Sequence, residues 1–592
     1  VFLLSGLAQH AEAATTYYAS PTGSTTASCI DSSANVCSIA RAEAVAISGD
    51  LVEAACGTYA LGATALTVNV NITMYSVTDK CATITGNNAT APVILTVANN
   101  ANDLIFRGFR VIPDGGIASA ASRSISLFTI TGYTATVTVD SVYAESAANS
   151  AIGNNMLTGN AIIRNISTGG TTGAQGFIYG VNQATNGVQK VWIDGCSGSI
   201  TTSVANTAAV QLLRSTSASF PMYIKVNNCN LNITVPTSIG ATAAGRGIVL
   251  TNIAPAPDFS NATTSPLIEN NVISIDASGG TSADSLGIAI GATNASYPAP
   301  FTIVRNNTVT CYSPACFGIA IGEGNIPSYV DYAQVYGNKV YGTYYNGSAT
   351  PHGIRLGQVM GGHVYQNYVQ GFEVGIIMSE NSMGMVSGNI VNGAFYAGLY
   401  AKGTGATGTP TFSNNTVIID DSFVGAKVGS YGCLSSAIND ASFNTVNVNF
   451  NNNLCYIKSG ATTTWKYVQF DSNQVGTFTN NQFYSEPTLA IPFTYNGSNY
   501  ATLALWNALA NVGIDYEARP DLNCHTFSSY TTANNCLPPR PQSTISTAGI
   551  SSRFHYVPRY FNGCQADTGI LSIGAFGSCP GSFTNIVRNW AI

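Results

Sequence analysis

The sequence predicts an all-β fold: a single-stranded right-handed parallel β-helix solenoid with an N-terminal helical cap and a disulfide-rich C-terminal cap. Two repeated phrases predict it, one built around Asn and one around Gly, which alternate along the middle of the chain. Only 8% of the 592 residues are charged, far below the roughly 25% of ordinary soluble domains, and Asn, Thr, Ser and Gly supply most of the polarity instead. Each coil of a solenoid buries its apolar side chains against its neighbours, so one stack can hold a chain of this length.

The first phrase reads apolar, two polar residues, Asn, any residue, apolar, as from Ile268 to Ile273. Asn tolerates left-handed backbone at a sharp bend, and stacked Asn amides can form a hydrogen-bonded ladder. We therefore expect a column of turn Asn residues from Asn271 to Asn473. Its expected members are Asn271, Asn307, Asn338, Asn367, Asn389, Asn415, Asn453 and Asn473, with weaker forms of the phrase around Phe109, Val142, Asn165, Cys196 and Cys229.

The second phrase reads Gly, apolar, any residue, apolar. Alternation with a period of two indicates a strand, so each coil contains at least two strands. We expect the Gly to mark a position where a Cβ atom would crowd its neighbours. The phrase begins at Gly247, Gly287, Gly318, Gly353, Gly375 and Gly398.

Changes in composition divide the chain into four segments. Residues 15–60 contain a strand, a turn and an Ala-rich segment at 38–48, and are expected to form the N-terminal cap. The repeats place the parallel β-helix at 61–486, and Pro and Cys enrichment places a capping region at 487–592. Residues 1–14 are apolar at Val1–Leu7, which fits either the remnant of a signal peptide or a retained arm that pairs with a neighbouring subunit.

The fourteen cysteines fall into seven neighbouring pairs, which favours disulfides formed in an oxidising compartment. Cys196 and Cys229 occupy the Asn position of successive coils, where stacked strands come close enough for a disulfide. The expected pairs are Cys29 with Cys37, Cys56 with Cys81, Cys196 with Cys229, Cys311 with Cys316, Cys433 with Cys455, Cys524 with Cys536, and Cys564 with Cys579.

Both ends of the chain carry family-like phrases. The order Ser20–Ser24, an Ala-rich helix, Gly49-Asp50 and Gly57–Tyr59 resembles the N-terminal entry of the pectate-lyase-like right-handed β-helix superfamily. The helix around Trp506 and the phrase Ser572–Phe576 are similar to its closing elements, although Ser572 and Gly577 replace the usual acids. The resemblance spans nearly the whole chain and implies the fold. Because members include lyases, hydrolases, adhesins and tailspikes, it does not assign an activity.

The candidate site residues share one phase, two positions before the turn Asn. Asp194, Glu269 and Arg305 are expected to stack with Asn227 as an outward charged column. Tyr336 and Tyr365 are expected to share one outward phase on adjacent coils. Stacked Tyr rings can hold sugar rings or pack against a second protein, although aromatic pairing between strands explains them equally. The charged column can bind a ligand, although a solvated face explains it as well. The catalytic residues are unknown, and no metal site is predicted.

An enzymatic interpretation lacks its usual residues. The segment Val191–Gly195 resembles the Trp-Ile-Asp-His phrase of pectate lyases, but Gly195 stands where they have His. The Asp-Asp pair at Asp420-Asp421 follows His352-Gly353 rather than preceding a Gly-His-Gly, as galacturonan hydrolases of this fold require. His352 and His363 lack a carboxylate partner at a telling spacing. Lyase chemistry would need Ca²⁺ and a basic residue, so Ca²⁺ is expected only under that alternative, and no other cofactor.

The leading hypothesis is a secreted structural or adhesive protein of the cell surface that self-associates, for instance into a filament. The alternatives are a uronate polysaccharide lyase and a non-catalytic carbohydrate-binding protein. Only 22 Lys and Arg are spread along the chain, which excludes a nucleic-acid partner, and no apolar run is long enough to span a membrane. Export would make ten sequons candidate glycosylation sites: Asn71, Asn88, Asn165, Asn232, Asn261, Asn294, Asn306, Asn346, Asn414 and Asn496.

Overall fold

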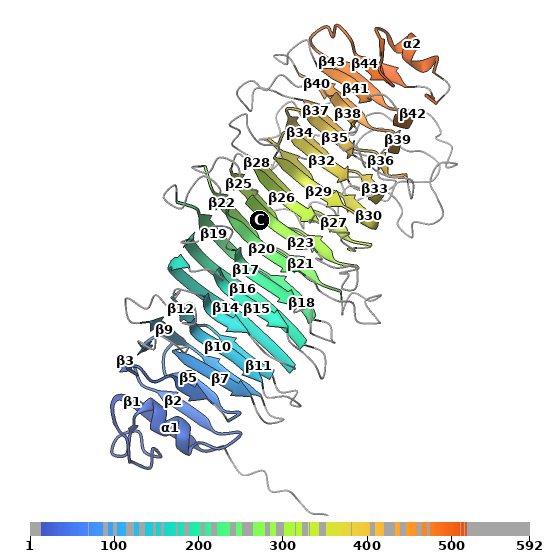
Figure 1. The fold of residues 1–592 in the computed structure, drawn as a ribbon. Coiled ribbons are helices and arrows are strands. Elements are labelled where there is room, and N and C mark those ends of the chain that lie inside the picture. Colours follow the sequence, from blue (N-terminus) through green and yellow to red (C-terminus); the bar gives the residue numbers. More distant parts are fainter. Residues whose placement is uncertain are drawn as a thin grey trace, which may run out of the picture.

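A computed structural model describes most of residues 14–517, with gaps of which the largest lie between strands at 114–122, 252–264, 292–300, 343–350, 420–431 and 438–445. Its strands stack in parallel into a right-handed β-helix that forms one long rod (Figure 1). A 30-stranded sheet wraps two sides of the rod and a 16-stranded sheet forms the third. The predicted fold class is confirmed.

Each coil in the middle of the rod contributes one strand to each of three faces. The first face leads into the Asn turn, and the second face leaves it. The first-face strands are β1 (Thr16–Ser24), β2 (Leu51–Ala54), β5 (Thr73–Ser76), β8 (Leu104–Arg107), β11 (Thr136–Asp140), β14 (Gly159–Thr172), β16 (Gln189–Thr202), β18 (Met222–Asn227), β21 (Leu267–Glu269), β24 (Ile303–Arg305), β27 (Gln334–Tyr336), β30 (Met360–Tyr365), β33 (Met383–Ser387), β36 (Thr411–Ser413), β39 (Val446–Asn451) and β42 (Gln474–Thr479).

The second face shares the larger sheet with the first, and β14 and β16 run through both faces. Its first strand is β3, which pairs with β6. Strand pairing of the stack therefore occurs before residue 61, the predicted start of the parallel β-helix. The strands of this face are β3 (Gly57–Ala60), β6 (Ala82–Gly86), β9 (Phe109–Pro113), β12 (Tyr143–Ala144), β19 (Asn230–Thr234), β22 (Val272–Asp276), β25 (Thr308–Tyr312), β28 (Lys339–Gly342), β31 (Tyr368–Gln370), β34 (Ile390–Ala394), β37 (Thr416–Ile419), β40 (Leu454–Ile457), β43 (Gln482–Ser485) and β46 (Tyr516–Glu517).

The third face contains the strands of the Gly phrase. At Gly287 an added Cβ atom would lie 2.3 Å from the carbonyl oxygen of Gly318 in the next coil, so close backbone approach explains the Gly. The strands are β4 (Leu66–Val68), β7 (Ile94–Ala98), β10 (Arg123–Thr129), β13 (Ser150–Asn154), β15 (Gly176–Asn182), β17 (Ala208–Arg214), β20 (Arg246–Thr251), β23 (Ser285–Gly291), β26 (Cys316–Ile321), β29 (His352–Gly357), β32 (Val374–Ser379), β35 (Ala397–Lys402), β38 (Gly432–Ala437), β41 (Lys466–Phe470), β44 (Phe493–Tyr495) and β45 (Ser498–Tyr500).

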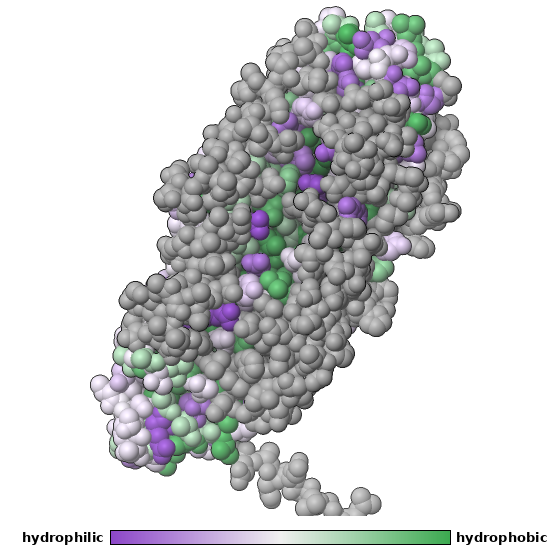
Figure 2. All heavy atoms as spheres, viewed as in Figure 1, coloured by the Kyte–Doolittle hydropathy of each residue, from purple (hydrophilic) through white to green (hydrophobic). Residues whose placement is uncertain are grey.

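Apolar side chains fill the interior of the rod from end to end. Inward residues of the three faces form one continuous core, which includes Ile268, Ile288 and Val304. A smaller buried cluster with Leu286 and Phe317 lies on the outward side of the third face. Figure 2 shows hydrophobic residues along the middle of the view, where Figure 1 labels β20 to β26.

A ladder of buried Asn side chains fixes the turn between the first and second faces. The Nδ2 of Asn338, for example, donates to the Oδ1 of Asn367 at 2.9 Å, and the backbone N–H of Asn338 donates to the same oxygen at 3.0 Å. The ladder members are Asn271, Asn307, Asn338, Asn367, Asn389, Asn415, Asn453 and Asn481.

Two details of this turn correct the sequence-based expectation. The left-handed residue precedes the ladder Asn, as at Asn270 (φ 56°), so the ladder Asn is selected for its hydrogen bonds rather than for its backbone. The prediction that Asn473 is the last Asn of the column is also wrong, because Asn453 donates to Asn481 instead. Asn473 itself lies outside the described residues. Phe470, which suggested Asn473, ends a third-face strand.

Disulfides hold the coils together at several points along the rod. The Cys196–Cys229 bond continues the ladder, because the Cys229 N–H donates to Asn271 Oδ1. Five of the seven predicted disulfides are confirmed: Cys29 with Cys37, Cys56 with Cys81, Cys196 with Cys229, Cys311 with Cys316, and Cys433 with Cys455. The other two predicted pairs, Cys524 with Cys536 and Cys564 with Cys579, lie outside the described residues and stay predictions.

Helical segments lie at the two ends of the described stack. Helix α1 (Ile39–Val45) lies at the N-terminal end (Figure 1), and Ser38 caps it by accepting from the backbone N–H of Arg41. Helix α2 (Leu503–Asn507) buries Trp506 at the other end. Residues 1–13 and 518–592, which include the predicted N-terminal arm and most of the predicted C-terminal cap, lie outside the described residues.

Candidate functional site

The five predicted ligand-binding residues lie in one column on the first face. Strand pairing places Asp194 opposite Asn227, Asn227 opposite Glu269, and Glu269 opposite Arg305. Tyr336 and Tyr365 follow on the next two coils. We call the set Asp194, Asn227, Glu269, Arg305, Tyr336 and Tyr365 the edge column, because each member lies at the turn where its first-face strand leads into the second face.

Side-chain contacts connect most of the edge column. The guanidinium of Arg305 lies 2.5 Å from a Glu269 carboxylate oxygen and donates to the Tyr336 hydroxyl at 3.0 Å. The Tyr336 and Tyr365 rings stack with their centroids 4.6 Å apart. The hydrogen bond to Tyr336 and the contact with Glu269 raise the pKa of Arg305. Adjacent charges therefore neutralise one another, while the Tyr faces are used for stacking.

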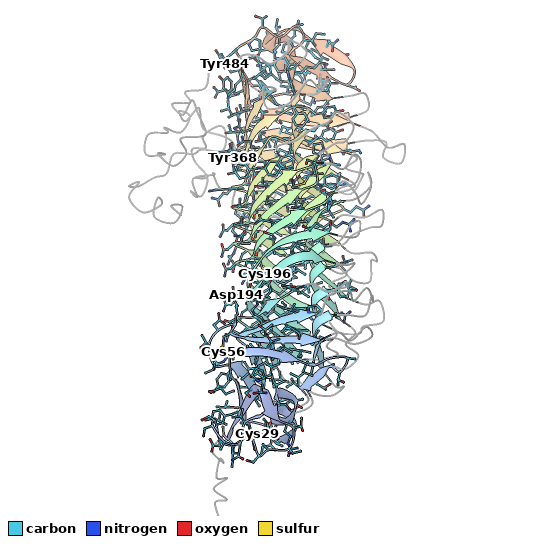
Figure 3. All side chains as sticks on the ribbon, turned by 90° about the vertical axis from the view of Figure 1, so that its left-hand side faces the viewer. Cys29, Cys56, Asp194, Cys196, Tyr368 and Tyr484 are labelled. Atoms are coloured by element: carbon cyan, nitrogen blue, oxygen red, sulfur yellow. A yellow bond between two sulfur atoms is a disulfide. The ribbon has the colours of Figure 1, made fainter. Side chains whose placement is uncertain are left out.

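Asp194 lies at the other end of the edge column and has its own partner. It accepts a hydrogen bond from Asn228 Nδ2 at 2.7 Å. Asn227 separates its strand from that of Glu269, so the two acids of the column belong to coils that are not adjacent. Figure 3 shows Asp194 at the margin of the rod.

The same column of positions continues toward the N-terminus with further charged and aromatic residues. Arg164 forms an ion pair with Asp140 at 3.0 Å, and Arg107 lies over the Tyr75 ring, 5.1 Å from its centroid. The Tyr75 hydroxyl donates to Glu53 at 2.8 Å, and burial together with Glu53 raises the pKa of Tyr75 to about 12. The rod thus presents one ordered line of polar side chains along the turn.

Sequence reasoning missed an exposed tryptophan beside the edge column. Trp192 is 38% exposed, and the ammonium of Lys225 lies 5.1 Å from its ring centroid. The two residues face each other on neighbouring coils, two positions before Asp194 and Asn227. The alternation of side chains along a strand could have predicted it. Asp194 was expected to point outward, so Trp192, two residues earlier on the same strand, had to point outward as well.

The two histidines among the described residues, His352 and His363, lie away from solvent. His363 is buried, its Nε2 lies 2.9 Å from Ser387 Oγ, and its ring contacts that of Tyr365. His352 stacks on Phe317 on the third face, where burial holds its pKa well below the usual value. The His363–Ser387 contact was not predicted, because it depends on the side-chain rotamers of residues on two coils. Asp420 and Asp421 lie outside the described residues.

The described residues contain no group of three His, Cys, Asp or Glu side chains arranged to hold a metal ion. Neither of their helices has the length and apolar character needed to cross a bilayer. The predicted glycosylation sites differ in access: Asn165, Asn232, Asn306 and Asn496 are exposed, whereas Asn71 and Asn414 are buried. The remaining four sequons lie outside the described residues.

The fold defines this chain as a right-handed parallel β-helix protein. No family model and no curated protein matches it. It is similar to a solved structure described as the complex of XylC with xylose, at 10% identity and a TM-score of 0.34, covering 95% of this chain and 98% of that chain. A mutant tailspike protein of E. coli bacteriophage HK620 in complex with a pentasaccharide has 10% identity and a TM-score of 0.26, covering 78% of this chain and 73% of that one.

Proposed function

We propose that the chain is a secreted, non-catalytic carbohydrate-binding protein of the cell surface, and that the edge column with Trp192 is its glycan-binding surface. One observation carries the proposal: residues from Asp194 to Tyr365 occupy the same outward position on six successive coils. A glycan lying along the rod would meet a new polar or aromatic side chain at each coil. The repeat is about 4.8 Å, set by the spacing of hydrogen-bonded strands.

The chemistry of these groups suits sugar hydroxyls. Carboxylates accept hydrogen bonds, guanidinium groups donate them, and Tyr hydroxyls do both. Trp192 adds a partly exposed aromatic ring beside them, which suits the mixed polar and apolar character of a sugar ring. Because Glu269 is already paired with Arg305, this pair requires no opposite charge on its ligand.

Export is supported by the disulfides. Five of them connect residues of the described chain, including Cys56–Cys81 and Cys433–Cys455, and such bonds persist in oxidising compartments. Self-association and a filament stay predictions, since the N-terminal arm invoked for them lies almost wholly outside the described residues.

Neutralising one pair tests the surface. We expect Glu269→Gln with Arg305→Gln to weaken binding to a responsive soluble polysaccharide about tenfold, because hydrogen bonds to charged groups contribute roughly 1.5–3 kcal/mol. Isothermal titration against a panel of soluble neutral and acidic polysaccharides measures it. The matched control neutralises the Asp79–Lys80 pair, in which Asp79 is exposed and Lys80 is half-buried, with Asp79→Asn and Lys80→Gln, and should leave affinity unchanged.

Two results would contradict the proposal. The first is a double variant that binds as tightly as the unmodified chain, or a chain that binds no member of the panel. The second is release of unsaturated products by the unmodified chain, measured by their ultraviolet absorbance, which would identify a lyase. We would repeat the absorbance measurement with added Ca²⁺ and with a chelator. This comparison tests whether product release requires the Ca²⁺ expected for a lyase.

A further inference from the structure

The second face carries a two-dimensional array of small polar side chains. On β16, β19, β22 and β25 the outward residues lie opposite one another from coil to coil, as Ser199 opposite Asn232, Asn232 opposite Ser274, and Ser274 opposite Thr310. Figure 3 looks toward the side of the rod where Figure 1 labels β19, β22 and β25. We call the following nine residues the hydroxyl-amide array: Ser197, Ser199, Thr201, Asn230, Asn232, Thr234, Ser274, Thr308 and Thr310.

The array has unused hydrogen-bonding capacity. Within the described part of the chain, none of its nine side chains hydrogen-bonds to another residue. Ser199, Asn230, Asn232 and Thr234 are exposed. The edge column differs on this point, because Arg305 already donates hydrogen bonds to Glu269 and Tyr336. Hydroxyl and amide groups offer both donors and acceptors, so the array can pair with a partner that also presents both.

The array is almost free of charge. Asp276 is the one charged residue on the second-face part of these four strands, and it lies at the margin, where it accepts hydrogen bonds from the backbone and hydroxyl of Ser278. Two apolar or aromatic side chains share the outward side of the same strands: Val272 is 47% exposed and Tyr312 is 43% exposed. Lys339, on the next coil, lies opposite Thr308 at one side of the array and is exposed. A highly charged polymer would find few counterions here, whereas a neutral one with polar and apolar groups would match both kinds of side chain.

The backbone fixes the spacing of these groups. Neighbouring strands lie about 4.8 Å apart, and alternate residues along one strand lie about 6.7 Å apart. The side chains are short and carry few rotatable bonds, so little conformational entropy is lost when they bind. A rigid lattice of this kind binds a partner best when the partner is itself ordered, because neither surface then has to rearrange.

We propose that the hydroxyl-amide array docks on the surface of an ordered, neutral polysaccharide, in which parallel chains present hydroxyl or acetamido groups at regular intervals. Val272 and Tyr312 contact the apolar faces of the sugar rings, and the array pairs with their polar groups. This inference goes beyond the proposed function, because it concerns another face and a solid ligand. Ordered water at an ice surface is the competing partner, but exposed Val and Tyr side chains favour sugar rings.

The test is co-sedimentation of the full chain with microcrystalline cellulose and with chitin particles. The chain should be produced in a host without N-glycosylation, since Asn232 and Thr234 belong to one sequon. We expect the unmodified chain to bind at least one solid, and binding to persist in about 0.5 M salt, where exposed charges are screened. Asn232→Lys and, separately, Ser199→Lys should each weaken binding at least tenfold by placing an ammonium in the array.

Controls separate this inference from the proposed function. Thr58→Lys introduces the same group on β3, outside the array, and should not change co-sedimentation. The Glu269→Gln and Arg305→Gln double variant should bind the soluble polysaccharide about tenfold more weakly, as hydrogen bonds to charged groups predict, yet still sediment with the particles. The inference is overturned if neither solid binds the chain, if both array variants bind as the unmodified chain does, or if the chain shapes ice crystals without binding a polysaccharide.

Discussion

Asn367→Ala is expected to lower the free energy of unfolding by about 3 kcal/mol or more, because it opens the buried ladder in the middle of the stack. Asn367 Oδ1 accepts from the backbone N–H and from Nδ2 of Asn338. Its own Nδ2 donates to the carbonyl of Val335 and to Asn389 Oδ1. Removing the amide leaves donors and acceptors on both neighbouring coils without partners, in a place that water does not reach.

Urea unfolding followed by circular dichroism measures this change. Asn230→Ala is the matched control, since it removes the same amide from an exposed position where the side chain has no partner in the described chain. We expect that variant to stay within about 0.5 kcal/mol of the unmodified protein. Equal effects of the two substitutions would show that the ladder does not stabilise the fold.

Acidification is expected to stabilise the C-terminal end of the rod through Asp515. This carboxylate ends the ladder, accepting from the backbone N–H of Asn481 at 2.7 Å, from its Nδ2 at 3.2 Å, and from Trp506 Nε1 at 2.9 Å. Burial raises the pKa of Asp515 from 3.8 to about 6, and these hydrogen bonds only partly oppose the shift. A folded-state pKa above the unfolded one means that the folded protein binds the proton more tightly.

The contribution of Asp515 is therefore fully present below pH 3.8 and is lost as the pH rises through about 6. At one pKa unit per 1.36 kcal/mol, the difference is about 3 kcal/mol. Hydrogen exchange of β42 and β43, compared between pH 4 and pH 7, measures it locally. Asp515→Asn should abolish this pH dependence, while weakening the end of the stack at both pH values because one donor loses its acceptor. A variant that keeps the full pH dependence would exclude Asp515 as its source.

The edge column could be predicted because the turn phrase fixes the phase of each strand. Glu269, Arg305 and Tyr336 each stand two residues before a ladder Asn, so loops of any length between coils leave their alignment unchanged. The side-chain contacts within and beside the column were harder to predict. The hydrogen bond from Arg305 to Tyr336 and the contact between His363 and Ser387 depend on the rotamers of side chains on neighbouring coils. A single sequence contains no pattern that indicates these rotamers.

The end of the ladder and the hydroxyl-amide array escaped prediction for different physical reasons. Phe470 to Asn473 imitates the turn phrase, but Phe470 belongs to the third face, and the ladder passes to Asn481 and then to a carboxylate. An Asp can replace an Asn there because the last member only has to accept. The array has no motif of its own, since Ser, Thr and Asn are common throughout this chain, and only the pairing of strands brings Ser199 and Asn232 together.

The disulfide between Cys196 and Cys229 also determines how the rod would respond to a pulling force. A stack held by parallel strands can be drawn out coil by coil from an end. Here the bond closes a loop of sequence separation 33 within the rod. At about 3.4 Å per extended residue, that loop withholds about 110 Å of chain from the stretched length. Until the bond is reduced, the extension of the molecule is shortened by this amount, and tension bypasses the enclosed coil along a covalent path.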